Sequence, residues 1–411
     1  MNANPVNANP VNTNTSDAPQ PFPVLWVAAG LALGAAISLG LARFSYALLL
    51  PTMRADLGWS YFTAGAMNTA NAVGYLIGAL MTPRLLKNFG ARRLLVCGCI
   101  ATAALLAAHG VVLTDAALLS LRLLTGISSA LVFVAGGLMA ARLGAGQANA
   151  GLLLGIYYGG TGVGIIASTL LVPALAARDV PHAWQGAWWG LAFAALCAAL
   201  VSAWATRQQF EPPPLPSQQA QSFRWQDFSF GLAGYFMFGL GYIGYMTFTV
   251  TLLREQGLAS GLVNAYFCLL GVGVMASSWL WARLLQRYRG GLPMAVLNGL
   301  LALATLLPVL STQPLVVFAS GALFGAVFLS VVASTTALVR HNLPASAWSS
   351  GISAFTVVFA AGQIIGPSAV GWLADRSGGQ SGGLQTGLAC SAAVLAVGAL
   401  LAWSQKPLGR V

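Results

Sequence analysis

Two arginines of this chain fall inside long apolar runs, where a cation is costly to hold. Arg43 lies in the first of these runs, residues 24–53, and Arg122 lies in the fourth. The acidic residues all lie in the N-terminal tail, at the ends of apolar runs or between them. A charge in the middle of a bilayer costs about 3 kcal/mol or more. Because a guanidinium stays charged and offers a planar fork for carboxylate or phosphate, we expect both charges to be held for an anion that enters from outside.

The depths of the two arginines are compatible with a shared ligand. Arg122 stands seven residues from the outer end of its run, which is roughly 10 Å at the rise of a helix. Arg43 stands eleven residues from the outer end of its own run, or roughly 16 Å. A second interpretation stays open, in which each guanidinium binds backbone carbonyls or the side chains of Asn68 and Asn71 and only joins helices.

The composition is that of a polytopic membrane protein. Of the 411 residues, 57% are hydrophobic and only 7% are charged, with a mean hydropathy of +0.77. Soluble domains carry about 25% charged residues. The runs are apolar on all sides and do not alternate as strands of a spanning barrel would, so we predict an all-α fold. The net charge of +11 does not indicate nucleic-acid binding, because the basic residues are scattered over short loops.

Twelve apolar segments are long enough to cross the hydrocarbon as helices, which takes about 20 residues. Of the 19 Lys and Arg, 13 fall on the side that holds the N-terminus, four fall on the other side, and two are the immersed arginines. This bias predicts that both termini are cytoplasmic. The predicted spans are 24–53, 61–83, 93–113, 115–141, 148–176, 184–205, 227–253, 260–282, 292–311, 313–339, 347–373 and 384–404.

The segments divide into two sets of six. Residues 1–23 repeat an Asn- and Pro-containing unit with few apolar side chains, so we expect a disordered tail. This tail has no Lys or Arg before the first run and does not resemble a cleaved signal peptide. We expect an N-terminal bundle over 24–206, a Pro-rich cytoplasmic linker over 207–226 and a C-terminal bundle over 227–411.

The two bundles are related by an internal repeat. The segment Gly40–Tyr46 aligns with Gly239–Tyr245 at an offset of 199 residues, and the same offset pairs Asp56 with Glu255. Further along, it still aligns an Arg-Leu-Leu triplet in each half. Parallel repeats of six spans are typical of transporters whose substrate site lies near the midplane between the halves.

At this point the chain resembles the major facilitator superfamily over nearly its whole length. The segments Gly40–Pro51, with the sequence Gly-Leu-Ala-Arg-Phe-Ser-Tyr-Ala-Leu-Leu-Leu-Pro, and Met53–Trp59 resemble those of a bacterial branch called YbfB/YjiJ-like. So do the segments Asn71–Gly78 and Gly362–Pro367. The resemblance implies a monomeric, multi-pass protein of the bacterial inner membrane that binds a small solute and needs no cofactor or metal.

The resemblance also suggests a charged latch between the second and third spans. In that family this loop carries a Gly, an Asp-Arg pair and a Gly-Arg-Arg/Lys sequence, which hold the halves together as the transporter changes state. The Asp is missing in this chain, so the acidic part of such a latch is in doubt, and the cations could serve only to orient the helices. The expected latch residues are Gly78, Gly90, Arg92, Arg93 and Arg283.

The repeat suggests partners for the arginines in a binding site. Tyr242 aligns with Arg43 and Tyr245 aligns with Tyr46. Aromatic rings with a polar tip suit a small amphipathic ligand, although simple packing would also explain them. The full set of candidate binding residues is Arg43, Arg122, Tyr242, Tyr245, Tyr46, Asn71 and Gln363. Residues expected to bend or closely pack helices are Gly160, Gly162, Gly366 and Pro367.

These observations favour a secondary transporter of a small organic solute, such as a carboxylate, that works by alternating access. A proton-coupled exporter of drug-like compounds is the main alternative, but such coupling usually uses an intramembrane acid, and none is evident. A membrane enzyme or a non-transporting sensor is a minor alternative, because no catalytic set of residues is present. His109, near the outer end of the third span, is expected at the surface and could otherwise relay protons.

Overall fold

The regular structure of this protein is entirely helical over the residues described by the computed structural model, which are 24–144, 150–176, 180–207, 223–378 and 381–408. The described part of the first half forms α1 (Val24–Ala35), η1 (Ala36–Phe44), α2 (Tyr46–Leu57), α3 (Tyr61–Phe89), α4 (Ala91–His109), α5 (Asp115–Leu143), α6 (Ala150–Ala176) and α7 (Trp184–Ala205). The described part of the second half forms η2 (Trp225–Phe228), α8 (Ser229–Glu255), α9 (Ser260–Leu280), α10 (Ala282–Arg287), α11 (Leu292–Leu310), α12 (Pro314–Asn342), η3 (Ala345–Ala347), α13 (Trp348–Arg376) and α14 (Ser381–Trp403).

Eleven helical segments of the described chain are long and apolar enough to cross a membrane. The first of them, Val24–Leu57, comprises α1, η1 and α2. Large apolar side chains lie exposed on the outside of the bundle, among them Phe193, Leu315 and Leu400, each at least 70% exposed. Soluble proteins rarely expose so much apolar surface. The expectation of an all-α membrane protein is therefore confirmed, with eleven candidate spans.

The first span differs from the plain helix expected from the sequence. Residues 36–44 form the π-helical segment η1, in which the backbone N–H of Ser45 donates to the carbonyl of Gly40 at 3.1 Å. All nine residues of this segment are buried. A Cβ at Gly40 would overlap the backbone of Gly164, so α6 approaches η1 closely. This wider winding, often found at functional sites, places Arg43 near the end of η1.

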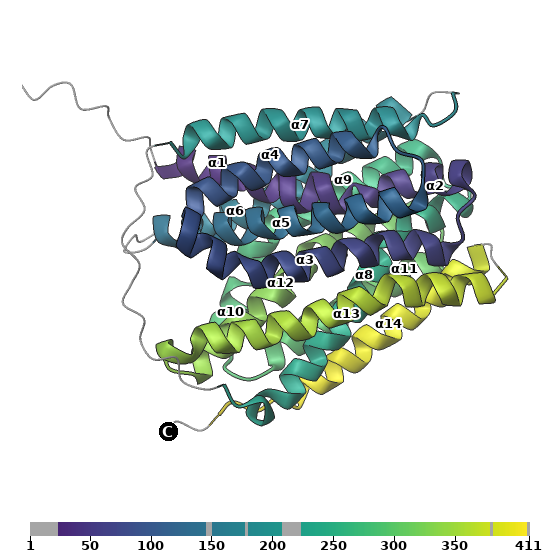
Figure 1. Cartoon of the computed structure of the whole chain (residues 1–411). Coiled ribbons are helices and arrows are strands. Elements are labelled where there is room, and N and C mark those ends of the chain that lie inside the picture. The colour runs from purple at the N-terminus through teal and green to yellow at the C-terminus, as the bar shows by residue number, and fades with distance from the viewer. Residues whose placement is uncertain (1–23, 145–149, 177–179, 208–222, 379–380, 409–411) are drawn as a thin grey trace, which may run out of the picture.

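The helix axes are roughly aligned, and the helices form two groups that pack side by side along their length (Figure 1). Within the first half, α3 and α4 pack on α5, while α6 packs on α1 and η1. Within the second half, α8 packs on α13 and α14, while α12 packs on α9 and α11. The halves meet where α3 packs on α13, α6 on α9 and α2 on α8. We call the end of the bundle that carries Val24 and Trp403 the termini end, and the end that carries Leu57 and Arg376 the far end.

Candidate functional site

The centre of the interface between the halves contains a buried guanidinium. Arg43 donates from Nη2 to the side-chain oxygen of Gln363 on α13. The hydroxyl of Tyr242 on α8 donates to the same oxygen at 2.9 Å, and the guanidinium lies 5.4 Å from the ring centre of Tyr75 on α3. The Nε atom of Arg43 is buried and has no hydrogen-bond partner. Three of the seven expected binding residues are thus brought together around one cation.

Arg122, in contrast, uses its nitrogens on neighbouring helices of its own half. Its Nη1 donates to the carbonyl of Ala42 at 2.9 Å, its Nη2 to the side-chain oxygen of Asn68 at 3.2 Å, and its Nε to the carbonyl of Met67 at 3.4 Å. Its guanidinium also lies 4.7 Å from the ring centre of Tyr46. These contacts match the interpretation in which this arginine joins helices, and they place it next to the Arg43 segment through Ala42.

Each of the remaining candidate binding residues, Asn71, Tyr46 and Tyr245, has a hydrogen-bond partner within its own half. The amide nitrogen of Asn71 donates to the carbonyl of Arg122 at 3.1 Å, and the Tyr46 hydroxyl donates to the carbonyl of Ala64 at 2.9 Å. Tyr245 lies within the second half, where its hydroxyl is 2.6 Å from that of Ser320. The Tyr245 hydroxyl therefore has its partner within its own half.

A second polar bridge crosses the interface beside the first. The amide nitrogen of Asn68, whose oxygen accepts from Arg122, donates to the hydroxyl of Thr247 on α8 at 2.6 Å. From the next residue of α3, the hydroxyl of Thr69 donates to the carbonyl of Ile364 on α13 at 2.8 Å. Asn68 was expected only as a partner of the arginines, and its link to the second half was not predicted.

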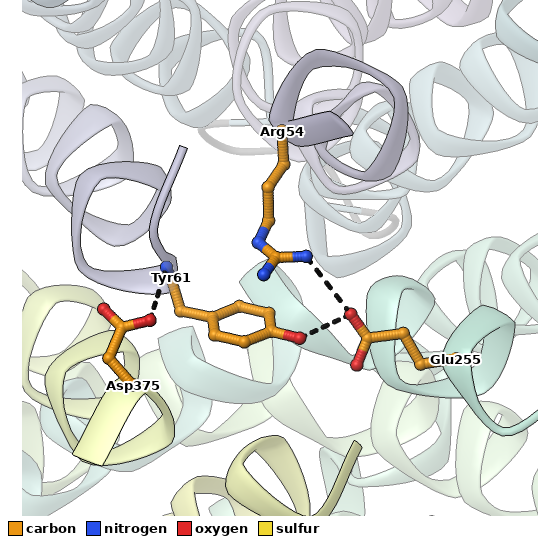
Figure 2. Close-up of polar contacts among 4 residues, drawn as sticks. All are labelled: Arg54, Tyr61, Glu255 and Asp375. Carbon is orange, nitrogen blue, oxygen red and sulfur yellow. Dashed lines mark hydrogen bonds and ion pairs between the residues drawn. The ribbon is translucent and has the colours of Figure 1, made fainter. Parts of the chain in front are cut away.

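The far end of the interface is closed by four side chains that come from both halves (Figure 2). Glu255 at the end of α8 accepts a hydrogen bond from the Tyr61 hydroxyl at 2.5 Å and lies 3.5 Å from Arg54 on α2. The guanidinium of Arg54 lies over the Tyr61 ring, 3.7 Å from its centre. Asp375 at the end of α13 accepts from the backbone N–H groups of Tyr61 and Phe62, each at 2.9 Å.

The contact made by Asp375 satisfies the first turn of a helix in the other half. The N–H groups that begin a helix have no partner within it, and a carboxylate there is favoured by the helix dipole. Ser60 caps α3 as well, by accepting from the N–H of Thr63. None of these four residues of the far end (Arg54, Tyr61, Glu255 and Asp375) was predicted as functional. The only sequence signal was the alignment of Asp56 with Glu255.

The expected latch residues lie at the termini end. Arg92 donates to the carbonyls of Thr206 and Ala203 at the end of α7, at 3.0 and 3.1 Å. Arg93 and Arg283 are exposed. The remaining two latch residues have structural roles: Gly78 lets α3 approach the carbonyl of Ile127 on α5, and Gly90 joins α3 to α4 with a positive φ of 80°. A latch between the halves stays a prediction.

The four residues expected to bend helices all lie at close helix crossings. A Cβ at Gly160 would overlap the carbonyl of Ala32, one at Gly162 that of Gly271, and one at Gly366 that of Leu240. A Cβ at Gly65 of α3 would likewise overlap the carbonyl of Pro367. Close helix packing explains why the residues at these crossings are small. The role of the four residues in bending helices stays a prediction.

His109 was expected at the surface, but the structure places it in the interior. It is fully buried, its ring stacks on Trp188 with centres 4.5 Å apart, and its Nδ1 is 2.7 Å from the carbonyl of Leu105. The imidazole packs between α4 and α7. The position of His109 near the end of its span suggested an exposed residue, but stacking on Trp188 keeps the ring inside the bundle. Within the described residues no group of three or more His, Cys, Asp or Glu could hold a metal ion.

Two aromatic residues that the sequence analysis missed lie beside Tyr242 of the Arg43 site. Phe328 and Phe359 lie nearly parallel to the Tyr242 ring, with ring centres 6.1 and 5.7 Å away. A Phe or Tyr inside an apolar run has no signal that separates a site residue from a lipid-facing or core residue.

Membrane helices arranged in two packed halves are typical of transporters whose substrate site lies between the halves. The family model described as "Uncharacterised MFS-type transporter YbfB" matches residues 35–403, so the chain belongs to this family of the major facilitator superfamily. The family and the similar solved structures are transporters rather than enzymes. No curated protein sequence matches the chain.

Solved transporter structures share this fold. A bacterial homologue of the human lysosomal transporter Spinster, in an inward-facing and unoccupied conformation, has a TM-score of 0.74 at 13% identity, covering 94% of this chain and 97% of its own. The nucleoside transporter NupG has a TM-score of 0.68 at 14% identity, covering 93% of this chain and 99% of its own. At these identities the likeness concerns the fold alone.

Proposed function

We propose that this protein is a secondary active transporter that moves a small organic anion, such as a carboxylate, across the bacterial inner membrane by alternating access. The observation that carries this proposal is the buried guanidinium of Arg43, whose hydrogen-bond partner is the neutral amide of Gln363. A buried cation without a counter-charge is costly. An anion that binds beside it offsets that cost, and the position of Arg43 between the halves is where such a solute must pass.

The proposed topology has twelve spans, with α3 as the twelfth beside the eleven apolar segments. α3 is 29 residues long, and its asparagines Asn68 and Asn71 are buried inside the bundle rather than facing lipid. Its cations, Arg84 and Lys87, lie near the termini end. In this topology both termini are cytoplasmic, the bundles 24–206 and 227–411 are joined by the linker 207–226, and the protein works as a monomer.

The proposed cycle uses the polar contacts between the halves as its closed outer gate. The bridges run from Arg43–Gln363 and Asn68–Thr247 at the centre to Glu255 and its partners at the far end. With the far end outside, this conformation is closed to the exterior. A carboxylate that binds Arg43 replaces the oxygen of Gln363 as its partner, so solute binding releases one of the bonds between the halves. This competition links occupancy to the movement of the bundles.

Transport in proteoliposomes tests the proposal by comparing the two arginines. Arg43→Gln should lower anion flux at least about tenfold, because it removes a charge-assisted hydrogen bond to the solute, while the protein keeps its melting temperature. Arg122→Gln should instead destabilise the fold by about 1–3 kcal/mol, because buried acceptors lose their donor. If Arg43→Gln leaves anion flux unchanged in folded protein, the proposed role of Arg43 is wrong.

A proton-coupled exporter of drug-like compounds is the second candidate function, and the aromatic rings around Tyr242 favour it. The two carboxylates of the interface, Glu255 and Asp375, lie at the far end and not beside these rings. Efflux of a hydrophobic dye that stops when the pH gradient is collapsed would support the exporter. Anion exchange that persists without a pH gradient would count against it.

A further inference from the structure

The described acidic residues all have partners away from the central site. Asp56 binds His182 and Trp184, Asp115 binds Trp59, Asp227 binds Arg224, and Glu255 and Asp375 close the far end. Of the two buried arginines, Arg122 binds three neutral acceptors. Arg43 has one hydrogen-bond acceptor, Gln363, and a buried Nε without a partner. Of these two arginines, Arg43 is therefore the one that is incompletely satisfied, and its only acceptor among the described residues is a neutral amide.

One cation selects for one negative charge. A phosphate group carries close to two charges at neutral pH and is usually bound by several donors or cations. Arg122 cannot serve as the second cation without leaving Asn68 and the Ala42 carbonyl unsatisfied. A carboxylate matches the fork of a single guanidinium. The charge balance thus indicates a monocarboxylate rather than a phosphorylated solute.

The surroundings of this cation are aromatic on both sides. Tyr242, which donates to Gln363, is also part of a series of nearly parallel rings with Phe238, Phe328 and Phe359, at interplanar angles of 8–19°. Across the interface, the guanidinium of Arg43 lies 5.4 Å from the ring centre of Tyr75. The anion-binding group and the rings are therefore joined through one tyrosine.

Two of these aromatic residues, Phe359 on α13 and Tyr75 on α3, are only partly buried, and they come from opposite halves of the interface. A further ring that packs against such a stacked series contributes about 0.5–1.5 kcal/mol beyond its buried area. Aliphatic residues would bury the same area without this preference for a flat ligand.

We propose that the solute is a small aromatic monocarboxylate, bound with its carboxylate on Arg43 and its ring between Phe359 of the second half and Tyr75 of the first half. The inference rests on the proposed transport of an anion through this site and adds the chemical class of the solute. The ring spans the interface, so it contacts both bundles while the carboxylate replaces Gln363 at the guanidinium.

Binding of matched small molecules to the purified, full-length protein separates charge from aromaticity. The probes are benzoate, cyclohexanecarboxylate with the same charge and similar size, and benzamide with the same ring and no charge. Benzoate should bind at least about threefold more tightly than cyclohexanecarboxylate, because only it stacks, and at least about tenfold more tightly than benzamide. Equal binding of benzoate and cyclohexanecarboxylate, or no binding of benzoate, would overturn the aromatic class.

Variants locate the two contributions. Phe359→Leu should lower benzoate affinity about two- to tenfold and leave cyclohexanecarboxylate affinity unchanged. Phe193→Leu is the matched control, because Phe193 is 70% exposed on the outside of α7. Arg43→Gln should weaken both carboxylates. If aliphatic carboxylates bind through Arg43 and benzoate does not, the aromatic class fails while anion transport stands. If only benzamide binds, both proposals fail.

Discussion

At the scale of single residues, the gate depends on a small number of polar atoms. The Glu255 carboxylate accepts from Tyr61 and pairs with Arg54, so one side chain of the second half holds two helices of the first. The side chains of Arg54 and Glu255 are 27% and 24% exposed. An ion pair with this exposure contributes about 0–1 kcal/mol. Such a contact is weak enough to break in every transport cycle and still bias the closed state.

Glu255→Gln should open the far end without unfolding the protein. The amide oxygen still accepts from the Tyr61 hydroxyl, but the charge pair with Arg54 is lost, which shifts the balance of conformations by up to about 1 kcal/mol, or fivefold. Spin labels at the exposed positions Ala55 and Ala259 report the separation of the far ends of α2 and α9. We expect a larger population of long distances in the variant.

The control for this gate variant is Asp227→Asn, which breaks the exposed pair with Arg224 at the termini end and replaces the same kind of group. It should leave the distance distribution unchanged. An unchanged distribution in Glu255→Gln as well would show that the carboxylate does not hold the gate. A collapse of the melting temperature in Glu255→Gln would show that it supports the fold instead.

At the scale of elements, the sequence predicted helices well and their special windings poorly. Long apolar runs define helices because nothing else satisfies the backbone in lipid. Polar residues such as Arg43 and Gln363 stand out inside such runs, so the sequence could single them out as candidates, and the structure places them in contact. The π-helical η1 was not, because its winding follows from the approach of α6, a tertiary contact. The gate was missed because Glu255 and Asp375 resemble ordinary interfacial charges at helix ends.

The crossing of α6 and α9 provides a prediction at this scale. Gly162→Ala places a Cβ against the carbonyl of Gly271 on α9, so the two halves must separate there. The variant should transport several-fold more slowly and shift the balance of conformations. Gly159→Ala on the same helix is the control, since its nearest neighbour is Met275 at 3.8 Å. Both substitutions gain helix propensity, about 1 kcal/mol, so a defect only in Gly162→Ala reports the crossing. Equal rates in the two variants would contradict it.

At the scale of the whole molecule, the polar contacts between the halves can be followed along part of the interface. Among the residues that the structure describes, hydrogen bonds through Gln363, Thr247, Ile364, Glu255 and Asp375 join the halves from the centre to the far end. These contacts account for a conformation held shut at the far end, and the proposed orientation places that end outside.

The orientation and the spanning role of α3 are tested together by two cysteines. Ala55 precedes α3 at the far end and Asn88 lies near the end of α3 at the termini end, and both are exposed. In a variant without the five native cysteines, Ala55→Cys should react with a membrane-impermeant maleimide in intact cells, because the far end faces outward. Asn88→Cys should react only after the membrane is opened, because a 29-residue helix, about 43 Å long, separates the two sites. Labelling of both positions from outside would remove α3 from the spans, and the reverse pattern would invert the protein in the membrane.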